Sequence, residues 1–245
     1  MRFRSSLLAV ACSLALVGVA CGSNHDASPP VKVTAGQPAA HAQATHLSAA
    51  SSPSTNSDAV KLYGTMRQLW ADHMQYTVMT VDAFFHDNSA LQPRLNRLLQ
   101  NQKDIGAAIV PYFGQDAANK LTDLLTTHIK QAVPVLTAAK SGDQAALKKA
   151  EDDWYANAKE IADFLSAANP DNWPASATEP DMKTHIDQTT TYSVDLLKGD
   201  YAKAVTDYDT AFNHMMMLAD TLAQGIDAKF PDKVSSSSAT LPRTE

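Results

Sequence analysis

Cysteine is almost missing from this chain: its 245 residues contain two, Cys12 and Cys21. Cys12 lies inside an apolar N-terminal stretch with the composition of a secretory signal. Once that stretch is removed, Cys21 has no second cysteine with which to pair. The sequence therefore excludes a disulfide framework and a metal site built from several thiolates.

Clusters of basic residues and the common nucleotide-binding and hydrolase motifs are missing too. Removal of residues 1–20 takes away Arg2 and Arg4 and no acid, so the net charge falls from −6 to −8. An acidic chain without a Lys/Arg patch lacks the surface that nucleic acid needs. The sequence contains no Walker loop, Gly-x-Gly-x-x-Gly turn, Gly-x-Ser-x-Gly elbow or Cys-x-x-Cys pair. Nucleotide-driven chemistry and serine hydrolysis therefore have no support.

The N-terminus carries the features of an exported protein. Residues 1–20 are predicted to be a signal peptide, in which Arg2 and Arg4 precede an apolar stretch too short for a membrane span. Small residues lead into Cys21 and resemble a bacterial lipobox, although Gly18 stands where leucine is usual. We expect acylation of Cys21, which makes the membrane a partner and places the protein on its outer or periplasmic side. The alternative is plain secretion with Cys21 as a free thiol.

The rest of the chain divides by composition into a tether, one domain and a tail. The tether, residues 21–55, begins with the lipidated Cys21 and is rich in Ser, Ala, Pro, Thr and His. Residues 233–245 have a similar composition, and both segments are predicted to be disordered. Residues 56–232 form the predicted domain, which is of ordinary size.

The domain is predicted to be all-α. Six glycines fall inside it, and no stretch shows the alternation of a β-strand. Apolar residues instead recur three and four positions apart, as on the buried face of a helix. We expect a bundle of about six helices, which cover residues 57–86, 91–112, 116–140, 144–168, 181–198 and 201–229.

An internal repeat is the most informative feature of the domain. The segment Thr-His-Ile-Lys-Gln at residues 127–131 returns as Thr-His-Ile-Asp-Gln at residues 184–188, 57 positions later. The same offset places Asn157 on His214. A weaker third copy opens the domain around His73, with Asn101 or Gln102 in the place of Asn157. The sequence therefore predicts repeated αα-hairpins, two of them clear and the third weaker.

The repeat predicts a layer of histidines inside the bundle. His73, His128 and His185 would lie at one level on the first helices of three hairpins, and His214 would face them from a second helix. Imidazoles from facing helices can bind Cu, Zn or Fe, so these four are candidate metal ligands. Six neighbouring side chains are candidates to ligate the metal or to orient the imidazoles: Asp72, Asn101, Asp104, Asn157, Glu160 and Asp220.

A purely structural layer is the alternative interpretation. Buried histidines are commonly core residues that make one hydrogen bond, and Thr77 and Thr189 follow His73 and His185 by one turn, where they could supply it. The spacing also lacks the Glu-x-x-His pairs of di-iron bundles and the His-Glu-x-x-His of zinc hydrolases. A small-ligand pocket lined by the layer is a third possibility.

Three segments resemble a poorly characterised family of bacterial exported helical-bundle proteins. They are Leu-Trp-Ala-Asp-His at residues 69–73, Asn-Gln-Lys-Asp-Ile-Gly at residues 101–106, and residues 154–170. The resemblance implies the bundle fold and carries no activity. Some members are labelled acetylglutamate kinase, but that enzyme's α/β fold and glycine-rich phosphate loops have no counterpart in this sequence.

Taken together, these features predict a lipid-anchored extracytoplasmic binding protein that holds a transition metal in its histidine layer. Two other functions stay open. One is an interaction scaffold in which the polar layer only specifies core packing. The other is a metal-centre enzyme, which would need an open coordination position.

Overall fold

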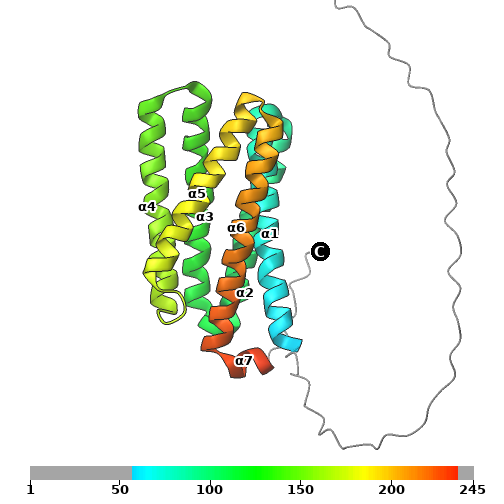
Figure 1. The fold of residues 1–245 in the computed structure, drawn as a ribbon, viewed down its shortest axis with the longest axis vertical. Coiled ribbons are helices and arrows are strands. Elements are labelled where there is room, and N and C mark those ends of the chain that lie inside the picture. Colours follow the sequence, from blue (N-terminus) through cyan, green and yellow to red (C-terminus); the bar gives the residue numbers. More distant parts are fainter. Residues whose placement is uncertain (1–56, 237–245) are drawn as a thin grey trace, which may run out of the picture. The chain divides into compact units, whose positions relative to one another are not determined.

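The computed structural model describes residues 57–236, and this part of the chain consists of helices joined by short turns, without a strand (Figure 1). The prediction of an all-α bundle is confirmed. The signal peptide, Cys21, the tether and residues 237–245 of the tail lie outside the described residues. No helix within residues 57–236 is long and apolar enough to cross a membrane. The helices are α1 (Ser57–His86), α2 (Asn88–Phe113), α3 (Gln115–Ser141), α4 (Gln144–Ala168), α5 (Ala175–Lys198), α6 (Tyr201–Lys229) and α7 (Pro231–Ser236).

The six long helices form a closed ring of three αα-hairpins. Each helix packs against the next, and α6 packs back against α1. There the guanidinium of Arg67 donates two hydrogen bonds of 2.6 and 2.7 Å to the carboxylate of Asp220. The first helices of the hairpins, α1, α3 and α5, also contact one another, so they surround the interior of the bundle.

Equivalent turns close the second and third hairpins, as the repeat predicts. Gly142 and Gly199 adopt the left-handed conformation with φ of 73° and 77°, which glycine reaches without a steric penalty. The amide of the aspartate after each glycine then bonds back to a carbonyl of the preceding helix, Asp143 to Ala138 and Asp200 to Asp195.

Three predicted boundaries were wrong. Helix α2 begins three residues earlier than expected because the side chain of Asp87 caps the amide of Ser89 at 3.0 Å. Helix α5 begins at Ala175, six residues earlier than expected, and runs through Pro180, which removes only one backbone hydrogen bond. The domain continues past residue 232 into α7, whose Val234 is fully buried.

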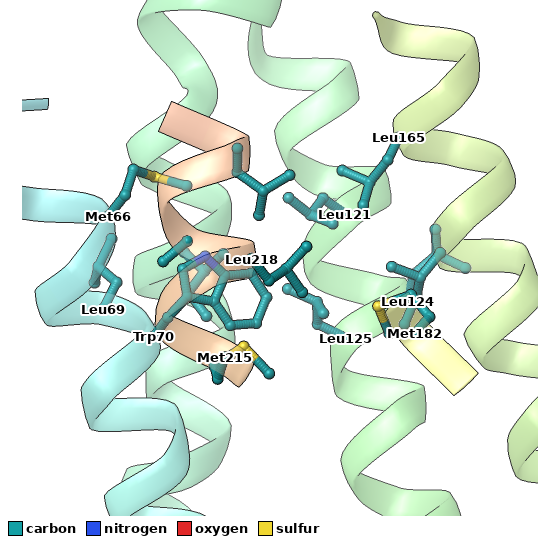
Figure 2. Close-up of a cluster of buried hydrophobic side chains, with 14 of the residues drawn as sticks. Met66, Leu69, Trp70, Leu121, Leu124, Leu125, Leu165, Met182, Met215 and Leu218 are labelled. Atoms are coloured by element: carbon teal, nitrogen blue, oxygen red, sulfur yellow. The ribbon is translucent and has the colours of Figure 1, made fainter. Parts of the chain in front are cut away.

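The half of the bundle that contains the N-terminal ends of α1, α3 and α5 is filled by large apolar side chains. Figure 2 shows Trp70 of α1 among Leu218 of α6 and Leu121 and Leu125 of α3. Met182 of α5 lies in the same cluster. This packed half forms a rigid support beneath the histidine layer.

Candidate functional site: a histidine layer beside an apolar cavity

Three of the four predicted metal ligands lie together in the interior. The side chains of His73, His128 and His185 come from α1, α3 and α5 and are only 2 to 3% exposed. The ring centroids of His73 and His185 are 5.6 Å apart, and those of His128 and His185 are 5.7 Å apart. Each histidine occupies the same position in its own hairpin, so the repeat places one imidazole on each inner helix.

The outer helices hold this layer through three equivalent hydrogen bonds. Asn101 donates to the carbonyl of Leu69 at 2.9 Å, and Asn157 donates to that of Leu124 at 3.3 Å. In the third hairpin, Nε2 of His214 donates to the carbonyl of Asp181 at 3.0 Å. Each acceptor lies four residues before the histidine of its inner helix, so the three contacts are copies of one interaction.

The rings themselves are held differently in the three hairpins. Nδ1 of His73 lies 3.4 Å from the amide nitrogen of Gln102, and Nδ1 of His128 lies 3.1 Å from Oδ1 of Asn157. In the third hairpin the Nε2–H of His214 donates to a backbone carbonyl, and Nδ1 of His185 has no protein partner. The hydroxyl of Thr77 bonds to the carbonyl of His73 and not to its ring, and that of Thr189 has no partner among the described residues, so the threonine pairing of the structural alternative does not form.

The tautomer of His128 follows from its partner. Because the amide nitrogen of Asn157 donates to Leu124, the oxygen of the same amide faces the histidine ring. An amide oxygen only accepts, so Nδ1 of His128 carries the proton and Nε2 is a bare acceptor. This Nε2 is buried and has no hydrogen-bond partner among the described residues.

Burial keeps all three imidazoles neutral. Desolvation, reinforced by the nearby His128, lowers the pKa of His73 to about 3. Desolvation also lowers the pKa of His128 to about 4, against the bond to Asn157, which raises it. The pKa of His185 is lowered well below its ordinary value, first by burial and then by the neighbouring histidines. At neutral pH the layer is therefore polar but uncharged.

The fourth predicted ligand, His214, does not join the cluster as a free ligand. Its Nε2 is already bonded to the backbone of α5, and its side chain is only partly buried. Within residues 57–236, no three His, Cys, Asp or Glu side chains are arranged so that they could hold one metal ion. The interior thus offers three neutral imidazoles whose nitrogens are not gathered around one point.

The carboxylates proposed as supporting residues lie on the outside of the bundle. Asp72 and Asp104 pair with Arg97 at 3.2 and 3.4 Å, Asp220 pairs with Arg67, and Glu160 is exposed. None of these four carboxylates is hydrogen-bonded to a histidine in the described part of the chain. Of the six predicted supporting residues, Asn157 alone bonds to an imidazole, and Asn101 supports the layer through the backbone of α1.

A cavity of about 200 Å³ adjoins the histidine layer on the side opposite the packed core. Its wall comes from α1 to α5, with none of it from α6, and it extends to the partly exposed Phe84 and Phe85 of α1 and to Val133 of α3, which is 40% exposed. Besides the three histidines, Glu151 is the one ionisable residue in the wall. The site is therefore a mostly apolar chamber with imidazoles at one end.

The repeat explains why the two sides of the layer differ. Three residues before each histidine stands a large apolar residue, Trp70, Leu125 or Met182, and all three are in the packed core. Four residues after each histidine stands a small residue, and all three of these line the cavity: Thr77, Ala132 and Thr189. Small side chains on three facing helices leave space between them that no protein atom fills. This triplet was a sequence signal for the cavity, but Thr77 and Thr189 had been considered only as hydrogen-bond partners of the histidines in the structural alternative.

Several residues of the cavity wall carry a polar atom that has no hydrogen-bond partner among the described residues. Nε2 of His128, Nδ1 of His185, Nε1 of Trp154 and the hydroxyl oxygens of Thr189 and Thr190 are buried without a protein hydrogen bond. Buried polar atoms are nearly always paired in folded proteins, because an unpaired one costs about 1 to 3 kcal/mol. Five of the ten such atoms within residues 57–236 belong to residues of the cavity wall, so the polar groups beside the chamber are incompletely paired by the protein.

No protein-family model, curated protein or solved structure matches this chain in the three comparisons that were made. The family resemblance of residues 69–73, 101–106 and 154–170 therefore stays a prediction. The function has to be inferred from the histidine layer and the cavity alone.

Proposed function

We propose that this protein is an extracytoplasmic binding protein, anchored through a lipid on Cys21, that holds a small apolar molecule in the cavity between α1, α3 and α5. One observation carries the proposal: a mostly apolar cavity of about 200 Å³ has the neutral imidazoles of His73, His128 and His185 in its wall. Ligand pockets commonly combine an apolar lining with a few convergent polar groups.

The volume and the charge of the chamber define the class of ligand. An apolar cavity of roughly 150 Å³ takes up benzene, which has six non-hydrogen atoms, so a chamber of about 200 Å³ suits a molecule of roughly eight or nine. The neighbouring imidazoles are neutral, and an isolated ion would lose its hydration without a countercharge. An uncharged ligand is therefore favoured.

Filling the chamber is expected to abolish binding. Ser193 of α5 is 3% exposed and lines the cavity, so Ser193→Leu places a branched apolar side chain in the ligand's space. We expect calorimetric titration to show binding of 4-ethylphenol and 4-ethyltoluene by the wild-type protein, and affinity for both at least tenfold weaker in the variant.

The matched control is Ser176→Leu, the same exchange at an exposed position of the same helix, which should bind like the wild type. Circular dichroism would establish that both variants remain folded. Binding by neither compound to the wild type, or equal binding by the wild type and Ser193→Leu, would refute a ligand site in this chamber.

Metal binding is the second candidate function, and the bare Nε2 of His128 beside His73 and His185 favours it. A metal would need ring rotations that turn three nitrogens toward one point, because the described side chains do not converge in that way. Three or four nitrogen ligands at about 2.0 to 2.1 Å are the usual requirement for zinc.

Elemental analysis of the untagged mature chain tests the metal candidate. If the layer binds metal, the wild type should contain about one equivalent of Cu, Zn or Fe, and a folded His128→Ala, His185→Ala variant should contain none. The variant keeps the tether histidines His25, His41 and His46, so metal held by the tether would remain in both proteins. Equal metal contents, including none in either after reconstitution, would exclude the layer as a metal site.

A further inference from the structure

The wall of the chamber extends along the bundle axis. Each of the five helices in it contributes residues from at least three successive turns, which start at the histidine layer and continue away from the packed core. On α1 these residues run from His73 to Phe85, and on α3 they run from His128 to Ala139. At 1.5 Å per residue these stretches are about 16 to 18 Å long, whereas a sphere of about 200 Å³ is only about 7 Å across. Since α1 and α3 run alongside the chamber, the chamber is elongated and narrow.

The two ends of the chamber differ in their access to solvent. At one end His73, His128 and His185 are only 2 to 3% exposed, and the packed core lies behind them. At the other end the outermost lining residue of every helix is partly exposed: Phe85, Leu91, Ala139, Leu147 and Val194. The chamber is therefore closed at the histidine layer and reaches the surface at the end of the bundle.

The wall between these ends offers little to a polar group. The hydroxyls of Thr77, Thr80 and Ser193 donate to carbonyls of their own helices, so they have no hydrogen left for a ligand. The carboxylate in the wall belongs to Glu151, which is partly exposed. A polar group drawn deep into the chamber would lose its hydration without full compensation.

We infer that the ligand is a straight-chain amphiphile whose single unbranched alkyl chain, of about eight carbons, lies along the bundle axis. Its methyl end lies near the histidine layer, and its uncharged polar end lies at the surface near Phe85 and Leu147. A compact ligand of the same volume would overlap the walls and leave the ends of the chamber empty. This inference rests on the proposed ligand-binding function and names the class of its ligand.

Three alcohols of one molecular formula separate shape and orientation from size. By calorimetric titration of the full mature protein, we expect 1-octanol to bind about tenfold or more tightly than 2,2,4-trimethyl-1-pentanol, whose branches overlap the walls. It should also bind about tenfold more tightly than 4-octanol, whose hydroxyl would be drawn into the chamber. From 1-pentanol to 1-octanol the affinity should rise about fourfold for each added methylene.

A variant at the closed end tests the length of the chamber. Ala132 lines the chamber one turn from His128, and Ala132→Leu adds three non-hydrogen atoms there. We expect 1-octanol to bind about tenfold or more weakly to this variant, because its chain no longer fits, and 1-pentanol to bind within about twofold of the wild type. Ala156→Leu makes the same exchange at an exposed position of α4 outside the wall, and it should bind both alcohols like the wild type.

The comparison of alcohols uses the wild type, so it decides the question even if Ala132→Leu does not fold. Equal affinities for 1-octanol and the branched alcohol would overturn the straight-chain ligand, as would equal losses for 1-pentanol and 1-octanol in folded Ala132→Leu. Equal affinities for 1-octanol and 4-octanol would overturn the end-on orientation. Binding of 4-ethyltoluene but of none of the alcohols would overturn the inference and leave the cavity as a ligand site. Failure of all these compounds to bind would instead refute the proposed function itself.

Discussion

The free energy of unfolding is expected to fall steeply as the pH is lowered from about 6.5 to 5. Burial depresses the pKa of His73 to about 3 and that of His128 to about 4 in the folded state, and it also lowers that of His185. In the unfolded chain all three titrate near 6.5. Between these values the unfolded chain binds more protons, so stability is full above about pH 6.5 and is lost as the pH falls toward the folded pKa values. By pH 5 the loss is about 2 kcal/mol for each histidine.

Urea unfolding at pH 7, 6 and 5 measures this loss. His185→Leu removes one of the three buried imidazoles, so the fall in stability from pH 7 to 5 should be about 2 kcal/mol smaller than in the wild type. His86→Gln is the control, since His86 lies at the exposed end of α1, and it should leave the fall nearly unchanged. A wild-type stability that is flat between pH 7 and 5 would show that the three rings are not buried and neutral as described.

Gly225→Ala is expected to destabilise the bundle by about 2 kcal/mol. A Cβ at this position of α6 would lie 2.1 Å from Nε1 and 2.6 Å from Cε2 of the Trp173 indole. The indole cannot easily move, because it is 3% exposed and its N–H donates to the carbonyl of Thr221 at 3.1 Å. Overpacking of a tight contact costs about 1 to 3 kcal/mol, which outweighs the gain in helix propensity from glycine to alanine.

Gly64→Ala is a matched control with the opposite expected sign. Gly64 lies inside α1, and a Cβ there would meet nothing within 4 Å. Without a clash, the higher helix propensity of alanine should stabilise the protein by up to about 1 kcal/mol. Thermal and urea unfolding of both variants compare the two sites. A stabilised Gly225→Ala would show that the loop carrying Trp173 does not pack closely on α6.

Much of the candidate site was predictable because the chain repeats itself. The offset of 57 residues between His128 and His185 indicated that the two histidines occupy the same place in two hairpins, and the weaker offset of 55 residues extended this to His73. A fixed position in each hairpin becomes a fixed level in a ring of hairpins. For that reason the imidazole rings of His73, His128 and His185 lie together in the structure.

The role of His214 was not predictable from the same offset. The repeat correctly aligned it with Asn157, but it could not show which hydrogen bond of Asn157 the imidazole would keep. His214 keeps the bond to the inner helix: its Nε2 donates to the carbonyl of Asp181 in α5, as the amide of Asn157 donates to that of Leu124 in α3. It does not make the second bond, to the ring, so Nδ1 of His185 has no partner. The choice depends on how the side chains of neighbouring helices meet in space, which a one-dimensional pattern does not contain.

The sequence by itself determined the helical class, the hairpin repeat and the level of the three inner histidines, because helical spacing and an internal offset are properties of one chain in order. Only the tertiary structure decided that Trp70 and its equivalents fill one side of the layer while Thr77, Ala132 and Thr189 leave a cavity on the other. A cavity is a difference between the space that three helices enclose and the volume of the side chains within it. That difference exists only once the helices are packed.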